Sequence, residues 1–179
     1  EITRLDVTGD GTKVLVDGNT AEIGGGMYSN DKSAIAVSSG ASLNVLNNKA
    51  ETTRMTGYDG CGGGLYLIQK CSLTISGVGT ELVVNRNTAD KKGGGVFAWI
   101  ASTVTVSSGA HISVINNKAL TSSGGGFFLL NEGTRLDVYS DDQLPPPPPP
   151  PPQTVGNCPS ACNDCHGKCT RWCSSSNWC

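Results

Sequence analysis

The chain has 179 residues, a formal net charge of −2 and 16% charged residues. This near-neutral balance excludes the strongly basic proteins that bind nucleic acids or anionic membranes through charge alone. The chain contains 24 glycines and only 6% aromatic residues, and no apolar run approaches the ~18 residues of a membrane-spanning helix. We therefore expect many short strands joined by tight turns, with no membrane span and no nucleic-acid partner.

An internal repeat runs through residues 1–140 and is marked by glycine triplets. The triplets are Gly24–Gly26, Gly62–Gly64, Gly93–Gly95 and Gly124–Gly126, at intervals of 38, 31 and 31 residues. An insert at residues 51–61 accounts for the longer first interval. Asn-x-Ala steps recur with the same period and begin at Asn19, Asn48, Asn87 and Asn117. A period near 30 residues is typical of solenoid proteins.

Within each unit, apolar residues alternate with polar residues at a period of two, as in STVTVSSG and HISVINN. No unit has the i, i+3, i+4 apolar spacing of a helix, which excludes leucine-rich, ankyrin and tetratricopeptide repeats. We therefore predict an all-β chain in which residues 1–140 form a right-handed parallel β-helix with three strands per coil. The expected core columns are Ile35, Leu73 and Val104; Val37, Ile75 and Val106; and Leu43, Leu82 and Ile112.

The two ends of the repeat share one sequence, because TRLDV occurs at residues 3–7 and again at residues 134–138. The spacing places both segments on the second strand of a unit, which predicts about four and a third coils. A stack this short presents unpaired strand edges at both ends, and such edges favour pairing with another chain. We therefore expect self-association into a polymer. The repeated asparagines are expected to stack, each side-chain amide bonding to the next.

Residues 141–156 contain eight consecutive prolines, and residues 157–179 hold six of the eight cysteines. Proline fixes its backbone angle and donates no hydrogen bond, so the run predicts a stiff polyproline II linker. The run comprises Pro145, Pro146, Pro147, Pro148, Pro149, Pro150, Pro151 and Pro152. The even number of clustered cysteines favours a small disulfide-rich module in an oxidising compartment. Its cysteines are Cys158, Cys162, Cys165, Cys169, Cys173 and Cys179.

The cysteines also admit a metal-binding interpretation. A zinc site could be built in the tail from Cys162, Cys165, His166 and Cys169. An even count in a secreted chain favours disulfides instead, so we expect no metal and no cofactor. Outside the tail, Cys61 and Cys71 flank one glycine triplet. We predict that they form a bridge, which would stabilise the fold by roughly 2.5–3 kcal/mol.

The sequence NNKA followed by GGGFF, at residues 116–119 and 124–128, resembles the repeats of polymorphic outer-membrane proteins and related right-handed β-helix surface proteins. This resemblance covers residues 1–140 and implies a surface or secreted setting with a structural or adhesive role. The proline run joined to a Cys-rich module resembles the hydroxyproline-rich extracellular glycoproteins of green-algal walls and flagellar hairs. That second resemblance implies hydroxylated prolines with O-linked glycans at positions 145–152. Neither resemblance supplies a catalytic residue.

We interpret the chain as an extracellular structural glycoprotein, a self-assembling fibre or a component of a cell surface or wall. The alternative is a secreted carbohydrate-binding or adhesin module on the same fold. A polysaccharide-cleaving enzyme would need carboxylates that converge on one face. The candidates are not expected to stack, because three fall in turns and two in the end strands: Glu22, Asp90 and Glu132; Asp6 and Asp137. A catalytic function is therefore not expected.

An aromatic residue stands four positions after the first glycine of every triplet. These residues, which we call the aromatic column, are Tyr28, Tyr66, Phe97 and Phe128. If their neighbours point into the core, strand alternation places the column on the surface, with rings about 4.8 Å apart. A polyproline II helix turns once every ~9.3 Å, close to two such spacings, so we predict that the proline run docks on this column. The alternative is a ladder of rings that faces the core.

Overall fold

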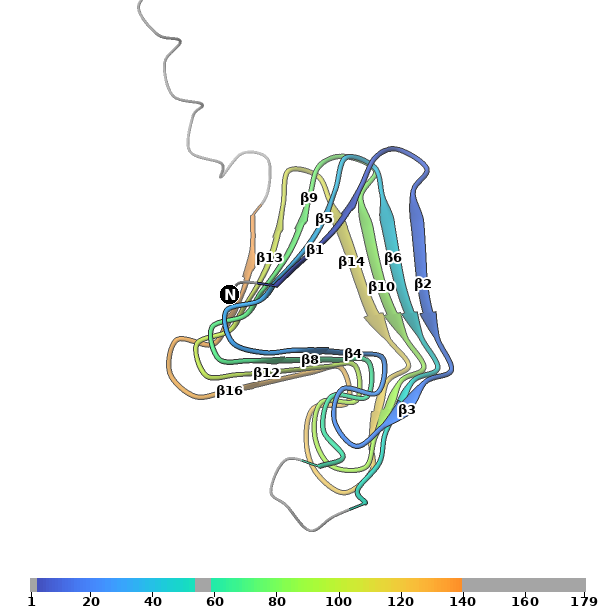
Figure 1. Cartoon of the computed structure of the whole chain (residues 1–179), viewed down its shortest axis with the longest axis vertical. Helices are drawn as coiled ribbons and strands as arrows, with labels where there is room; N and C mark the ends of the chain where they lie inside the picture. Colours follow the sequence, from blue (N-terminus) through green and yellow to red (C-terminus); the bar gives the residue numbers. More distant parts are fainter. Residues whose placement is uncertain (1–2, 54–58, 140–179) are drawn as a thin grey trace, which may run out of the picture. The chain divides into compact units, whose positions relative to one another are not determined.

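The computed structural model describes residues 3–53 and 59–139, and these residues form a parallel β-solenoid of about four turns (Figure 1). The predicted all-β parallel helix is confirmed, since every strand pairs in parallel with the equivalent strand one coil further along. Within the described part of the chain, no helix is long and apolar enough to cross a membrane.

The strands of successive coils pair into four parallel sheets, which form the sides of the solenoid and which we call walls (Figure 1). The first wall contains β1 (Arg4–Thr8), β5 (Ala34–Ser38), β9 (Ser72–Ser76), β13 (Thr103–Ser107) and β17 (Arg135–Val138). The second contains β2 (Lys13–Asp17), β6 (Ser42–Leu46), β10 (Glu81–Asn85) and β14 (His111–Ile115). The third contains β3 (Thr20–Ala21), β7 (Lys49–Ala50), β11 (Thr88–Ala89) and β15 (Lys118–Ala119). The fourth contains β4 (Met27–Ser29), β8 (Leu65–Ile68), β12 (Val96–Trp99) and β16 (Phe127–Leu130).

Each full coil therefore has four strands, and the prediction of three strands per coil is corrected. The additional strand is the two-residue strand of the third wall, which forms at the Asn-x-Ala step where a simple turn was expected. The chain bends just before this step, because the residue ahead of each asparagine has a left-handed backbone angle. These residues are Gly18, Asn47, Arg86 and Asn116, with φ of 69°, 53°, 56° and 55°.

The predicted core columns are confirmed and lie on the inner faces of the first and second walls. Ile35 pairs in register with Leu73 and Leu73 with Val104, and all three are buried. The columns through Val37 and Leu43 follow the same register, and only Ile112, in the last coil, is half-buried. The chain enters on β1 and leaves on β17, both in the first wall, as the two TRLDV segments predicted.

The stacked asparagines are also confirmed, at the corner between the second and third walls. The Nδ2 atoms of Asn19, Asn48 and Asn87 each donate to the Oδ1 atom of the next asparagine along the stack at 3.0 Å. The backbone nitrogens of the same residues donate to the same oxygens at 2.9 Å. Every bond of this ladder therefore runs in one direction, from lower to higher residue numbers.

The glycine triplets are required because adjacent coils approach closely at the start of the fourth wall. A Cβ atom on the third glycine of a triplet would lie against the carbonyl oxygen of the equivalent glycine on the next coil. The distances are 2.6 Å from Gly26 to Gly64, 2.6 Å from Gly64 to Gly95 and 2.7 Å from Gly95 to Gly126. A side chain at these positions would push the coils apart, since real Cβ contacts are not this short.

Candidate functional site

The aromatic column lies on the face of the fourth wall that points away from the main core. Its rings stack with centroid distances of 5.5 Å for Tyr28–Tyr66, 4.8 Å for Tyr66–Phe97 and 5.5 Å for Phe97–Phe128. Tyr66 and Phe97 are only 2% and 0% exposed, and with Cys61 they form a second core cluster. The chain that leaves the third wall folds back beneath this face before it enters the fourth wall (Figure 1).

The prediction of a surface column is therefore wrong for the two central rings. Alternation points the rings away from the main core, as expected, but the returning chain covers them. A proline rod cannot lie along the whole column, because Tyr66 and Phe97 are not accessible. Tyr28, which is 52% exposed at the N-terminal end of the stack, offers an open ring. Phe128 at the other end is half-buried, and Lys92 Nζ lies 5.1 Å from its ring centroid. Residues 145–152 themselves lie outside the described residues.

The bridge predicted between Cys61 and Cys71 is wrong, since both cysteines are free and buried. They belong to different clusters: Cys61 packs behind the fourth wall, whereas Cys71 faces the main core at the other end of β8. Cys71 Sγ donates to the carbonyl oxygen of Ile68 at 2.9 Å, as Ser102 Oγ does to Trp99 at 2.8 Å one coil later. Cys71 thus occupies a position that is a serine in the next coil of the repeat. The other free cysteine, Cys61, has a thiol pKa that burial raises above its ordinary value.

Three carboxylates form a column that sequence reasoning missed. Glu22, Glu51 and Asp90 each follow an alanine of the third wall, and these alanines are in register on successive coils. Glu22 accepts a hydrogen bond from Thr53, and Asp90 accepts one from the backbone nitrogen of Thr52 at 2.8 Å. Glu51 pairs with Lys49 at 2.6 Å. The expectation that the candidate acids do not stack is corrected for Glu22 and Asp90 only, which lie two coils apart with Glu51 between them. The hydrogen bonds of Glu22 and Asp90 hold the start of the insert.

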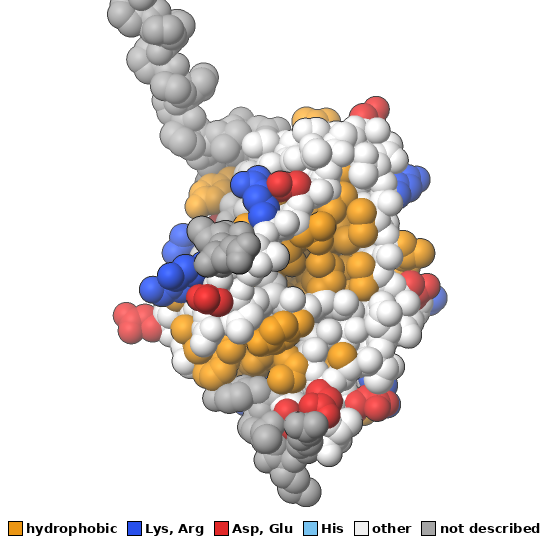
Figure 2. All heavy atoms as spheres, viewed as in Figure 1, with side chains coloured by type: hydrophobic (Ala, Val, Ile, Leu, Met, Phe, Trp, Pro, Cys, Tyr) orange, Lys and Arg blue, Asp and Glu red, His pale blue; other side chains and the backbone are white. Residues whose placement is uncertain are grey.

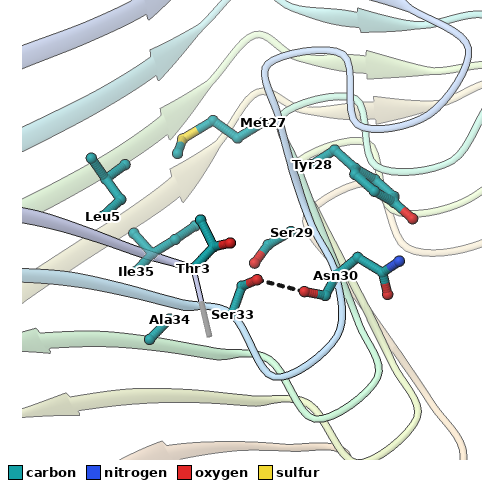
Figure 3. Close-up of a pocket in the computed structure, with 9 residues that line it drawn as sticks. All are labelled: Thr3, Leu5, Met27, Tyr28, Ser29, Asn30, Ser33, Ala34 and Ile35. Carbon is teal, nitrogen blue, oxygen red and sulfur yellow. Dashed lines mark hydrogen bonds between the residues drawn. The ribbon is translucent and has the colours of Figure 1, made fainter. Parts of the chain in front are cut away.

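A hollow of about 390 Å³ opens at the N-terminal end of the solenoid, between β1 and β4 (Figure 3). Leu5, Met27 and Ile35 line it with apolar surface. Ser29 is 6% exposed, and its hydroxyl, which belongs to the lining, has no hydrogen-bond partner. The hollow exists because Ser29 is smaller than Leu67, its register partner in the next coil. In addition, the part of the chain that the structure describes has no fourth-wall strand before β4. In the sequence, the hollow is indicated only by Ser29 itself, the one polar residue in a column that continues with Leu67, Ala98 and Leu129.

Both ends of the solenoid leave apolar residues open. Figure 2 shows hydrophobic side chains over the mouth of the coil and, separately, below β4 at the N-terminal end. Leu5 and Tyr28 are exposed there, and Val14, Val16 and Met27 are half-buried. At the C-terminal end, Leu129, Val138 and Tyr139 are 38%, 61% and 42% exposed. These two end faces, rather than a cleft on the side of the solenoid, are the candidate functional surfaces.

Comparisons with known proteins returned no matching family model, no similar curated protein and no similar solved structure. Among residues 3–53 and 59–139, no group of three or more His, Cys, Asp or Glu side chains could hold a metal ion. The tail cysteines, the alternative zinc ligands and the proline run are outside these ranges, so the predictions for them stay predictions.

Proposed function

We propose that the chain is an extracellular structural protein that self-assembles through the two ends of its β-solenoid. The observation that carries this proposal is the open apolar surface at both ends, where every wall also finishes in a strand edge. Unpaired strand edges favour addition of another strand, and natural proteins usually cover or charge them. Here the inward positions of the end strands carry apolar residues, among them Val14, Val16 and Val138. Charged residues occupy only outward positions of these strands, as in the pairs Arg4–Asp6 and Arg135–Asp137. We assign the coil a right-handed sense, because parallel crossovers prefer it.

The extracellular setting rests on the sequence of the tail. Six cysteines in residues 157–179 favour disulfides and therefore an oxidising compartment. The adjoining prolines resemble hydroxylated, O-glycosylated segments of wall and flagellar-hair glycoproteins, so we propose glycans at positions 145–152. The two free cysteines are compatible with such a compartment, since both thiols are buried and Cys61 has a raised pKa.

We assign no catalytic step, metal or cofactor to the end faces. Each of the three stacked carboxylates accepts a hydrogen bond from a nearby group of the chain. Glu22 accepts from the Thr53 hydroxyl. Glu51 accepts from Lys49 Nζ, and Asp90 from the backbone nitrogen of Thr52. Carboxylates held in this way stabilise a loop, whereas glycoside cleavage needs two that converge on a substrate. This arrangement favours a structural role over an enzymatic one.

Sedimentation velocity on the full secreted chain, with its native modifications, tests the proposal. We expect the weight-average sedimentation coefficient to rise with protein concentration, because end-to-end contacts obey mass action. A single monomeric species at every concentration would overturn the proposal. Glycan-array binding by that monomer would favour the adhesin alternative.

A further inference from the structure

We propose that copies of the chain stack head to tail, and that the last strand of one copy and the first strand of the next are alternative occupants of one position. The inference rests on the self-association proposed above and specifies its geometry. In this stack, β14, β15 and β16 of one copy lie on β2, β3 and β4 of the next. The joint position in the first wall is filled by either β17 or β1.

The strand count of the walls leads to this arrangement. One turn of the solenoid advances each wall by one rung, meaning one strand position, yet the first wall has five strands and the others have four. If β1 of the next copy were added beyond β17, its β2 would lie two rungs beyond β14. An empty rung would then remain in three walls. If β17 and β1 share one rung, all four walls continue without a gap.

The two strands that would share the rung have the same sequence, RLDV, over the four residues of the shorter strand, β17. Residues 3–7 and residues 134–138 both read TRLDV. Arg4 pairs with Asp6 at 2.7 Å, and Arg135 pairs with Asp137 at 2.6 Å. Leu5 lies beside Ile35 in the register of β5, and Leu136 lies beside Val104 in the register of β13. Either strand therefore presents the same side chains to its neighbours in the first wall.

The polarity of the asparagine ladder fits head-to-tail stacking. Each ladder asparagine donates to the next one, from Asn19 through Asn48 and Asn87 to Asn117. Asn117 Nδ2 already donates one hydrogen to the carbonyl oxygen of Val84, as Asn87 does to Val45, and a side-chain amide has two hydrogens. In the stack, the second hydrogen of Asn117 points to Asn19 of the next copy. Head-to-head stacking would reverse this direction.

The same register joins the apolar columns across the interface. Phe128 of one copy falls over Tyr28 of the next, so the aromatic column becomes continuous and Tyr28 is covered. Leu129 falls over Ser29, because both belong to the column that contains Leu67 and Ala98. In the stack, the exposed Leu129 side chain of one copy meets the mouth of the hollow beside β4 of the next copy. Figure 3 shows the residues that line this hollow.

Gly126→Ala tests the stack without disturbing the fold. A Cβ atom on Gly126 would meet only Val114 Cγ1, at 3.7 Å, which is an ordinary contact. In the stack it would meet the Gly26 carbonyl oxygen of the next copy, as Gly95 meets Gly126 at 2.7 Å within the chain. We expect Gly126→Ala to match the melting temperature of the wild type at concentrations where both are monomeric, and to lose the concentration-dependent species in sedimentation. Gly95→Ala, with the clash inside the chain, should lower the melting temperature, and Thr74→Ala on the side of the solenoid should change neither property.

Hydrogen exchange of the assembled wild-type protein tests the shared rung. Peptides covering β2, β4, β14 and β16 should gain protection on assembly, whereas one of the two TRLDV segments should lose it. Assembly that persists in Gly126→Ala, or full protection of both segments, would overturn this geometry while leaving self-association standing. A wild-type chain that stays monomeric would instead overturn the proposed function, and this geometry with it.

Discussion

The side chain of Asn87 connects three coils at one buried corner. Its Oδ1 accepts from the backbone nitrogen and the Nδ2 of Asn48, at 2.9 and 3.0 Å. Its Nδ2 donates to Asn117 at 3.0 Å and to the carbonyl oxygen of Val45 at 2.8 Å. A buried amide with all of these partners cannot be replaced by an apolar side chain without leaving its partners unsatisfied.

We expect Asn87→Ala to lower the free energy of unfolding by about 3 kcal/mol or more, because each buried polar group left without a partner costs about 1–3 kcal/mol. Asn19→Ala is the matched control: this residue is exposed at the end of the ladder and its side chain donates only to Asn48. Its loss should cost less than about 1 kcal/mol. Urea unfolding followed by circular dichroism measures both values. Equal losses in the two variants would contradict the ladder as a source of stability.

At the scale of strands, the inward columns carry the stability of the first wall. Val104 lies between Leu73 and Leu136 and is fully buried in the main core. Thr103 is its neighbour on the same strand but points outward, between Ser72 and Arg135. The two positions therefore differ in burial and in nearby charge, although they are adjacent in the chain.

Val104→Asp should destabilise the chain by about 3–5 kcal/mol, since it buries a carboxylate with no partner. Thr103→Asp should change stability by less than about 1 kcal/mol, because the new carboxylate lies in register with Arg135 at a partly exposed position. Thermal melts of both variants distinguish these effects. If Val104→Asp melted like the wild type, the inward assignment of this column would be wrong.

The inward columns were predictable because each carries period-two alternation at a fixed offset from a glycine triplet. The third wall was not, because a strand of two residues such as Lys49–Ala50 has no alternation to read. Alternation also gave the direction of Tyr66 and Phe97, but not their burial, since the covering chain comes from a different part of the coil. Cys71 could have been recognised as a corner residue, because its offset matches those of Ser33 and Ser102.

At the scale of the molecule, the solenoid is a stack of near-equivalent coils, and each coil contacts mainly its neighbours. Every strand pairs only with the strands one coil before and one coil after it. Stability in such a chain is close to a sum of coil terms and interface terms. The end faces are then independent of the number of coils between them, provided that whole coils are added or removed.

Deleting residues 93–123 removes one whole period of 31 residues and joins Lys92 to the next glycine triplet. Because Gly124 takes the place of Gly93, β16 should pair with β8 and β17 with β9, in the registers that β12 and β13 now have. We expect a folded, shorter solenoid whose circular-dichroism signal per residue is unchanged and whose free energy of unfolding falls by about a quarter. Deleting residues 93–108 instead removes the strands of two walls only, shifts every later strand out of register and should abolish cooperative unfolding. The shorter solenoid should still assemble, since β4 and β16 keep their free edges. A folded short variant that stays monomeric at concentrations where the wild type assembles would show that self-association through the end faces depends on the number of coils.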